Sequence, residues 1–154
     1  MDKHSGKINV WAAITIFGKL SIRTFRENLN SERYSNIIKE YLIPPANLMY
    51  PYGWILLQDG SPCHKGDAKH ILYYEVPYVL KWPSKSPDIN PIENVWHILK
   101  SQVRKRLPTD MEDLEKVIHE EWQNLNNQII TNIACSFEFR IKTLYNRKRN
   151  MLDY

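Results

Sequence analysis

The hydrophobic pattern of the first 25 residues predicts a β-hairpin. An apolar, partly β-branched run occupies residues 8–17 and ends at Gly18-Lys19. Residues 20–25 then alternate apolar and polar side chains with a period of two. Because that alternation is typical of a strand and a short polar interruption is typical of a turn, we expect two strands joined at Gly18.

The spacing of apolar residues changes to three and four after Asn30-Ser31, a pair that offers an N-cap. The residues with this helical spacing are Tyr34, Ile37, Ile38, Tyr41 and Leu42. Proline lacks an N–H and clashes with the preceding turn of a helix. The pattern therefore predicts a helix that ends at Pro44-Pro45.

The middle of the chain reads as strand, helix and strand. Residues 54–58 form a short continuous apolar run, which is the pattern of a strand buried on both faces. A helix is expected from about Lys65 to Tyr74, and a second strand over residues 76–82. A proline-punctuated loop follows over 83–90. This order predicts an α/β fold with a mixed sheet.

The chain after residue 90 is expected to be helical. The first helix has one apolar stripe, formed by Ile92, Val95, Trp96, Leu99 and Val103. Thr109 and Glu112 have the spacing of a capping box that opens a second helix. A third helix is expected from Ile130 to Leu144, where apolar residues recur at helical spacing.

Composition excludes several classes of protein. The 154 residues suffice for one domain, spanning 1–154, and 43% hydrophobic with 25% charged residues is typical of a globular protein. No apolar run approaches the roughly 18 residues of a membrane-spanning helix, and residues 1–6 lack the apolar core expected of a signal peptide. Two cysteines cannot form a disulfide framework, which favours a reducing intracellular compartment. The net charge of +4 permits a polyanionic partner.

Asp59 is the first candidate for chemistry. It follows a predicted strand directly, and the carboxyl ends of strands are where ligands bind in open α/β sheets. Asp before Gly60 is also an ordinary turn-forming residue. Its position alone leaves both interpretations open.

Glu93 is the second candidate. Asn90 and Pro91 place it at the third position of a helix, where a glutamate can serve only to cap the helix start. Three basic side chains share its predicted helix face: His97, Lys100 and Arg104. A carboxylate that leads a line of basic residues suits a metal site beside a phosphate backbone.

Two such carboxylates could hold Mg²⁺ or Mn²⁺. In two-metal phosphoryl transfer the ions carry four positive charges, and two carboxylates with one phosphodiester neutralise only about three, so a third carboxylate is expected. Zinc is disfavoured because Cys63 and His64 are adjacent and no second ligand pair has finger spacing. The sequence also has no nucleophile elbow and no glycine-rich phosphate loop.

Two blocks of the sequence closely resemble the catalytic core of the Tc-mariner superfamily of DDE transposases. They are Gln-Asp-Gly-Ser-Pro-Cys-His at residues 58–64 and Trp-Pro-Ser-Lys-Ser-Pro-Asp-Ile-Asn-Pro-Ile-Glu-Asn-Val-Trp at 82–96. The resemblance extends over residues 3–147. It implies an RNase H-like fold, a mixed central sheet flanked by helices. It also implies a two-metal endonuclease that cuts and joins DNA at transposon ends.

The resemblance assigns roles to individual residues. Asp59 corresponds to the second acid of the catalytic triad and Glu93 to the third, with Mg²⁺ or Mn²⁺ as cofactor and no small-molecule cofactor. Supporting roles at most are expected for His64 and Asn94. DNA contacts are expected for Lys85 and, because of the helix face they share with Glu93, for His97, Lys100 and Arg104. DNA is the expected partner, a homo-oligomer is possible, and the location is nuclear if the host is eukaryotic.

The sequence departs from the family pattern in three places. Gly60 stands where the family usually has Asn, and 33 residues separate Asp59 from Glu93, one fewer than usual. The first acid lies in the family on a strand upstream of the segment that matches Val10-Trp11, and the chain starts almost at that segment. We therefore expect the first strand and the N-terminal helix-turn-helix region to be missing.

This expectation leads to two functional hypotheses. The first is a transposase catalytic-core segment that retains Asp59 and Glu93 as metal ligands but is inactive alone. The alternative is a repurposed, non-catalytic module that binds DNA or protein.

Overall fold

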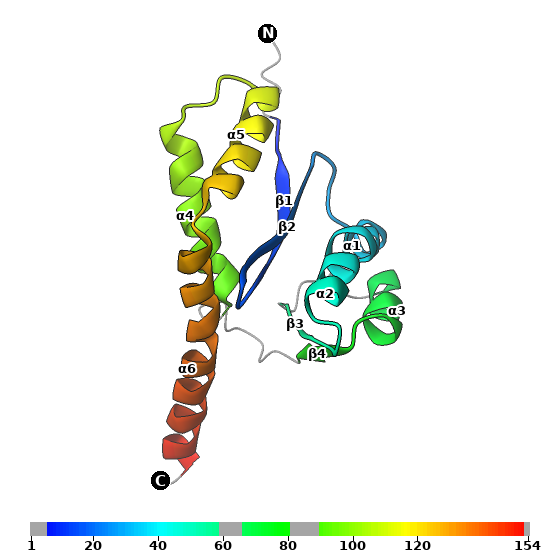
Figure 1. Ribbon diagram of the computed structural model, residues 1–154, viewed down its shortest axis with the longest axis vertical. Helices are drawn as coiled ribbons and strands as arrows, with labels where there is room; N and C mark the ends of the chain where they lie inside the picture. The colour runs from blue at the N-terminus through cyan, green and yellow to red at the C-terminus, as the bar shows by residue number, and fades with distance from the viewer. Residues whose placement is uncertain (1–5, 59–65, 81–89, 153–154) are drawn as a thin grey trace.

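The strands of the protein form two separate pairs. The computed structural model describes residues 6–58, 66–80 and 90–152. In this part of the chain, an antiparallel pair and a parallel pair make two two-stranded sheets (Figure 1). The predicted mixed α/β class is confirmed, although the described strands do not join into one continuous sheet.

The antiparallel pair is the predicted hairpin. Strand β1 (Asn9–Thr15) pairs with β2 (Gly18–Phe25). Gly18 has a φ of +117°, a conformation that side-chain-bearing residues rarely adopt. A Cβ at this position would also lie 2.7 Å from the side chain of Asn127. The turn therefore requires glycine for both its backbone angle and its close neighbour.

The predicted stop at Pro44-Pro45 is wrong. Helix α1 (Ser31–Ile37) runs into a π-helical segment η1 (Ile38–Leu42), and α2 (Ile43–Met49) follows without a break. Both prolines lie in the first turn of α2. At that position a missing N–H removes no helical hydrogen bond, so proline begins a helix there instead of ending one.

The parallel pair consists of β3 (Ile55–Leu57) and β4 (Tyr78–Leu80), with α3 (Asp67–Tyr74) between them in the chain. The predicted strand–helix–strand order is therefore confirmed. The expectation that the first of these strands is buried on both faces is wrong, because Ile55 is 65% exposed. Among the described strands, β3 pairs with β4 alone, and its other edge stays open.

The remainder of the chain is helical, as predicted: α4 (Pro91–Lys105), α5 (Met111–Asn124) and α6 (Asn127–Leu152). The predicted capping box lies one residue too early. Asp110 caps α5 by accepting a 2.8 Å hydrogen bond from the N–H of Asp113, whose carboxylate accepts one of 3.0 Å from the N–H of Thr109. Within the described ranges, no helix has the length and apolar character needed to cross a membrane.

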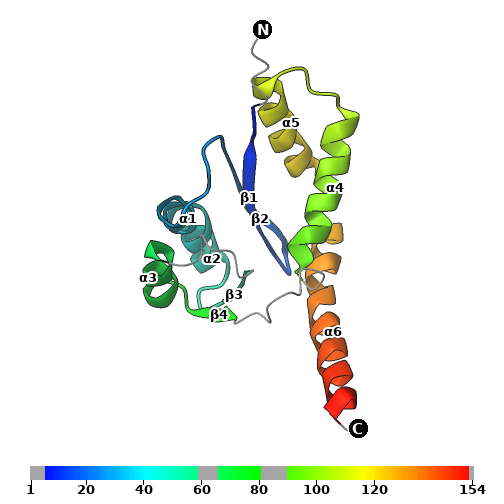
Figure 2. The same cartoon turned by 180° about the vertical axis from the view of Figure 1, so that it is seen from behind.

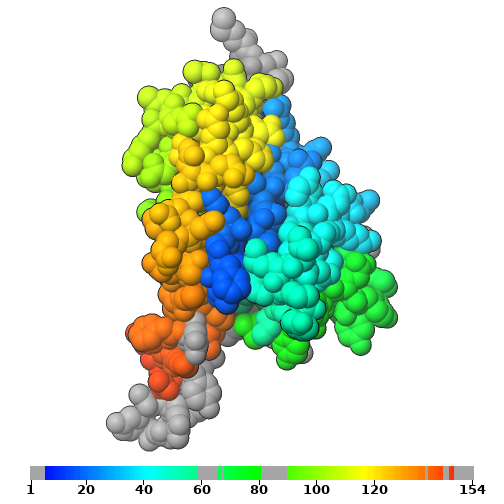
Figure 3. Space-filling model, viewed as in Figure 1, coloured from blue at the N-terminus to red at the C-terminus, as the bar shows by residue number. Residues whose placement is uncertain are grey.

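The hairpin lies between two hydrophobic clusters (Figures 1 and 2). On one face, Trp11 and Ala13 pack against the cluster of α1 to α3. On the other face, Val10, Ala12 and Ile14 pack against the cluster of α4 to α6. The space-filling view shows the hairpin (blue) seated between α2 (cyan) and α6 (orange) (Figure 3). The hairpin thus connects the two halves of the molecule.

A buried polar contact fixes β2 on α5. Thr24 is 2% exposed, and its hydroxyl donates a 2.6 Å hydrogen bond to Oε1 of Glu115. The same hydroxyl lies 3.0 Å from Nε2 of His119. The Thr24 hydrogen bond and, to a smaller extent, the nearby Arg26 guanidinium hold the pKa of Glu115 below its usual range. A lowered carboxyl pKa means that the ionised form stabilises the folded chain.

We expect Glu115→Gln to lower the free energy of unfolding by about 0.5–1 kcal/mol at pH 7, because it exchanges a charged acceptor for a neutral one at a partly exposed site. Since the folded pKa lies below the unfolded value, the stabilisation is present above about pH 4.3 and disappears as the pH falls through the folded pKa. Urea unfolding from pH 7 to pH 3 measures this difference.

The matched control is Glu112→Gln, which removes the same charge from a side chain that is 78% exposed. Its effect should be smaller at neutral pH. An equal effect of the two substitutions would show that the Thr24 contact contributes nothing specific.

Candidate metal and nucleic-acid site

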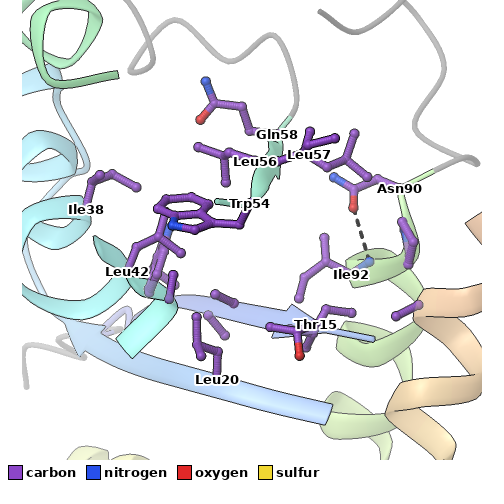
Figure 4. A pocket seen from close by; sticks show the side chains of 18 of the residues that line it. Thr15, Leu20, Ile38, Leu42, Trp54, Leu56, Leu57, Gln58, Asn90 and Ile92 are labelled. Carbon is purple, nitrogen blue, oxygen red and sulfur yellow. Dashed lines mark hydrogen bonds between the residues drawn. The ribbon is translucent and has the colours of Figure 1, made fainter. Parts of the chain in front are cut away.

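A groove lies between β1 and β3, because the β1–β2 sheet and the β3–β4 sheet are not joined in the described part of the chain. It is a cavity of about 630 Å³ whose lining includes residues of both strands, of the α1–α2 segment, of the start of α4 and of the middle of α6. Apolar side chains dominate the lining, and Trp54 and Leu56 of the β3 segment face Ile92 of α4 across it (Figure 4). The site therefore combines an apolar floor with two open strand edges.

Gln58 directly follows β3 and lines this groove. The hydroxyl of Tyr34, a residue only 3% exposed, donates a hydrogen bond to its Oε1. This contact anchors the chain at the residue that directly precedes Asp59. Asp59 itself lies outside the described residues, as do His64 and Lys85.

Glu93 lines the same groove from the first turn of α4. The predicted N-cap is confirmed, because Oδ1 of Asn90 accepts a 3.1 Å hydrogen bond from the N–H of Ile92. Pro91 occupies the first turn, as expected. The cap fixes the helix start and the exposed Glu93 with it, and the positive end of the helix dipole favours a carboxylate there.

The basic residues predicted beside Glu93 share its exposed face of α4. Val95, Leu99 and Val103 are buried and hold the other face of the helix against the core. The exposed residues of the stripe are Glu93, His97, Lys100 and Arg104. Helix geometry separates the first and last of them by about 16 Å along the axis.

Lys100 and Arg104 line a second cavity, of about 420 Å³, next to Ile8 and Asn9 at the start of the hairpin. Val10 and Trp96 line both cavities, so the two hollows adjoin along β1. The basic residues Lys100 and Arg104 of α4 therefore line a hollow that adjoins the groove at Glu93, on the same side of β1.

Asn94 has a partner that the sequence did not predict. Its Oδ1 accepts a 3.1 Å hydrogen bond from Nη1 of Arg140, in the middle of α6. The two residues lie 46 positions apart, so no local pattern could have paired them. The contact places a guanidinium from another helix beside the residue that follows Glu93.

The donor chemistry of the groove fits a hard divalent cation in part. Glu93 is the carboxylate among the described lining residues, and Gln58, Asn90 and Thr15 add neutral oxygen atoms. Mg²⁺ and Mn²⁺ prefer such oxygen ligands. Among the described residues, however, no group of three or more His, Cys, Asp or Glu side chains is placed to hold a metal. Further carboxylates are needed to complete the site.

Comparison with known protein families gives a match over most of the chain. A family described as DDE superfamily endonuclease matches residues 1–115. The Tc3 transposase of Caenorhabditis elegans is 28% identical over 97% of the chain and 46% of its own length. The Tcb2 transposase of Caenorhabditis briggsae is 27% identical over 95% of the chain and 54% of its own length. The chain thus spans about half the length of these relatives.

Solved structures show the same fold. The Mos1 transposase in a paired-end complex with the left transposon end has a TM-score of 0.70 at 17% identity, over 91% of this chain and 43% of that one. The Mos1 catalytic domain solved with raltegravir and Mn has a TM-score of 0.65 at 18% identity, over 86% of this chain and 70% of that one. The expected RNase H-like architecture is therefore confirmed, and the chain belongs to the DDE superfamily of endonucleases as a relative of the Tc-mariner transposases.

Proposed function

We propose that this chain forms part of the catalytic core of a DNA transposase, in which Asp59 and Glu93 bind Mg²⁺ or Mn²⁺. One observation carries the proposal: Gln58 and Glu93 line the same groove. Gln58 directly precedes Asp59 in the chain, so the two acids would enter the site from neighbouring walls. The Mos1 catalytic domain, solved with Mn and with Mg, supports a divalent metal.

In this proposal, each residue of the site has a separate role in binding metal or DNA. When bound, the metal ions activate the attacking oxygen and stabilise the leaving one. Glu93 supplies ligand oxygens, and Asn90 keeps it in place by capping α4. His97, Lys100 and Arg104 hold the phosphate backbone, with Lys85 as a further contact and His64 in support. The partner is DNA at transposon ends, as in the Mos1 complex with the left transposon end, and the location is nuclear in a eukaryotic host.

The groove also offers a place for the third carboxylate that charge balance requires. Among the described strands, β1 and β3 each have one open edge, and both edges line the groove. An extended segment seated there would gain backbone hydrogen bonds and bury the apolar lining. A carboxylate on such a segment would complete the site beside Glu93.

The same apolar groove favours the alternative function, a module that binds an extended segment of another protein without catalysis. The two functions differ in the fate of the carboxylates. A catalytic core needs Asp59 and Glu93 as metal ligands, whereas a binding module does not. Metal binding therefore distinguishes them.

Calorimetric titration with Mn²⁺ tests the metal site. We expect Asp59→Asn and Glu93→Gln each to weaken Mn²⁺ binding at least about tenfold, because each removes a charged oxygen ligand from a hard cation. Glu75→Gln, an exposed substitution after α3, serves as the control and should leave binding unchanged. Equal binding by the wild type and both site variants would exclude these carboxylates as ligands and favour the binding module.

Removal of the α4 cap should separate stability from metal binding. Asn90→Ala and Asn30→Ala each remove one side-chain cap, at α4 and α1 respectively, and each should cost about 1 kcal/mol of stability. Only Asn90→Ala should also weaken Mn²⁺ binding, since it loosens the turn that carries Glu93. Thermal unfolding and calorimetry on both variants measure the two effects. Identical Mn²⁺ affinities of the Asn90→Ala and Asn30→Ala variants would show that the α4 cap does not support the metal site.

A salt titration tests the basic face of α4. Lys100→Ala and Arg104→Ala should each weaken binding to a mixed-sequence DNA duplex and reduce the slope of log K against log salt by about one. Lys69→Ala, an exposed change on α3 across the hairpin, should leave the slope unchanged (Figure 1). An unaltered slope in the α4 variants would remove those residues from the interface.

A further inference from the structure

We propose that Arg140 binds a DNA phosphate beside Glu93, and that Asn94 is the positioning residue that orients its guanidinium. The inference rests on the proposed function, because it assumes DNA at the Glu93 groove. It adds a phosphate contact from α6, a helix to which neither the sequence motifs nor the basic stripe of α4 assigned a role.

The geometry brings α6 to the edge of the groove. Ala134 and Phe137 of α6 line the groove together with Glu93. Arg140 comes three residues after Phe137, so it lies one turn further along the same face of the helix. The middle of α6 lies beside the start of α4 in both ribbon views (Figures 1 and 2).

The hydrogen bond to Asn94 then fixes the direction of the arginine. Nη1 of Arg140 lies 3.1 Å from Oδ1 of Asn94, which directly follows Glu93 on α4. The next exposed residue one turn along from Asn94 is His97, the first basic residue of the stripe. The guanidinium is therefore held between Glu93 and the start of the basic line.

The chemistry of the Asn94 contact suits an arginine that also binds a ligand. A guanidinium has five N–H donors in a planar fork and can bind a neighbouring amide and a phosphate at once.

The position explains why a phosphate is the ligand. On α4, every basic residue lies to the C-terminal side of Glu93, and His97, Lys100 and Arg104 are those of the stripe. Arg140 supplies positive charge at the helix start from outside α4. A DNA backbone that follows the stripe would then meet the guanidinium from α6 at the start of α4, which would hold one phosphodiester next to the carboxylate of Glu93.

The experiment measures binding of a short mixed-sequence DNA duplex by fluorescence anisotropy between about 50 and 200 mM salt. Arg140→Gln removes the charge and keeps a polar side chain of intermediate length, and thermal unfolding checks that the variant is folded. We expect it to weaken binding about tenfold and to reduce the salt slope by about one. Arg140→Lys should keep the slope yet lose part of the affinity, because an ammonium lacks the planar fork.

Asn94→Ala should weaken binding less than Arg140→Gln and leave the slope unchanged, as a positioning role requires. Lys142→Ala is the charge-matched control on the same helix, about 200° around the axis from Arg140, and should leave the slope unchanged. An unchanged slope for Arg140→Gln, with or without a lower melting temperature, would overturn the proposal and leave Arg140 as a tether between α4 and α6.

The Mn²⁺ titration separates this inference from the proposed function. A reduced slope for Arg140→Gln together with no Mn²⁺ binding would keep the phosphate contact and reject the metal site. Mn²⁺ binding that depends on Glu93, together with an unchanged slope, would reject Arg140 alone.

Discussion

The structure depends on burying both faces of the β1–β2 hairpin. Apolar side chains alternate on the two faces of β1, so one set packs against α1 to α3 and the other against α4 to α6. Because burial of apolar surface is the main favourable term in folding, neither helical group can leave the hairpin without exposing its own cluster. The position of α4, and therefore of Glu93, follows from this arrangement.

The same hairpin creates the site through the edge that it leaves open. Every residue of β1 keeps partial exposure, although the strand is covered on both faces. Residues 10–15 of the strand line the groove that separates β1 from β3. Gln58 and Glu93 both line this groove, Gln58 from the end of the β3 segment and Glu93 from the first turn of α4. If the described strands formed one continuous sheet, β1 and β3 would be joined and the groove between them would not exist.

The charged residues beside the groove lie in a line along α4. The buried residues of α4 fix the rotation of the helix, and the exposed stripe from Glu93 to Arg104 is the consequence of that rotation. Asn90 fixes where the helix starts, and Arg140 reaches that start from α6. At the other end of α4, Arg106 pairs with acids of α5 and ties the helices together. Arginines thus contact both ends of α4: Arg140 donates to the side chain of Asn94, and Arg106 pairs with Glu120 and Glu121.

The amino-acid sequence by itself determined the features that depend on neighbours within a few positions. The hairpin, the strand–helix–strand segment, the α4 cap at Asn90 and the exposed stripe of α4 all follow from local periodicity and capping chemistry, which act within one or two turns. The two motif blocks around Asp59 and Glu93 indicated the family for the same reason, since each is contiguous. Asp59, His64 and Lys85 lie outside the described residues, so their roles stay predictions.

Tertiary structure decided the features for which the local signal was ambiguous or absent. Two prolines can end one helix or begin the next. In the folded chain they lie in the first turn of α2, which follows η1 directly. Two overlapping capping pairs compete at residues 109–113, and the pair that begins at Asp110 is the one formed. The groove, its shared lining by Gln58 and Glu93, and the Asn94–Arg140 contact all join segments far apart in the chain. Such contacts depend on how the helices dock on the hairpin, a property that no window of sequence contains.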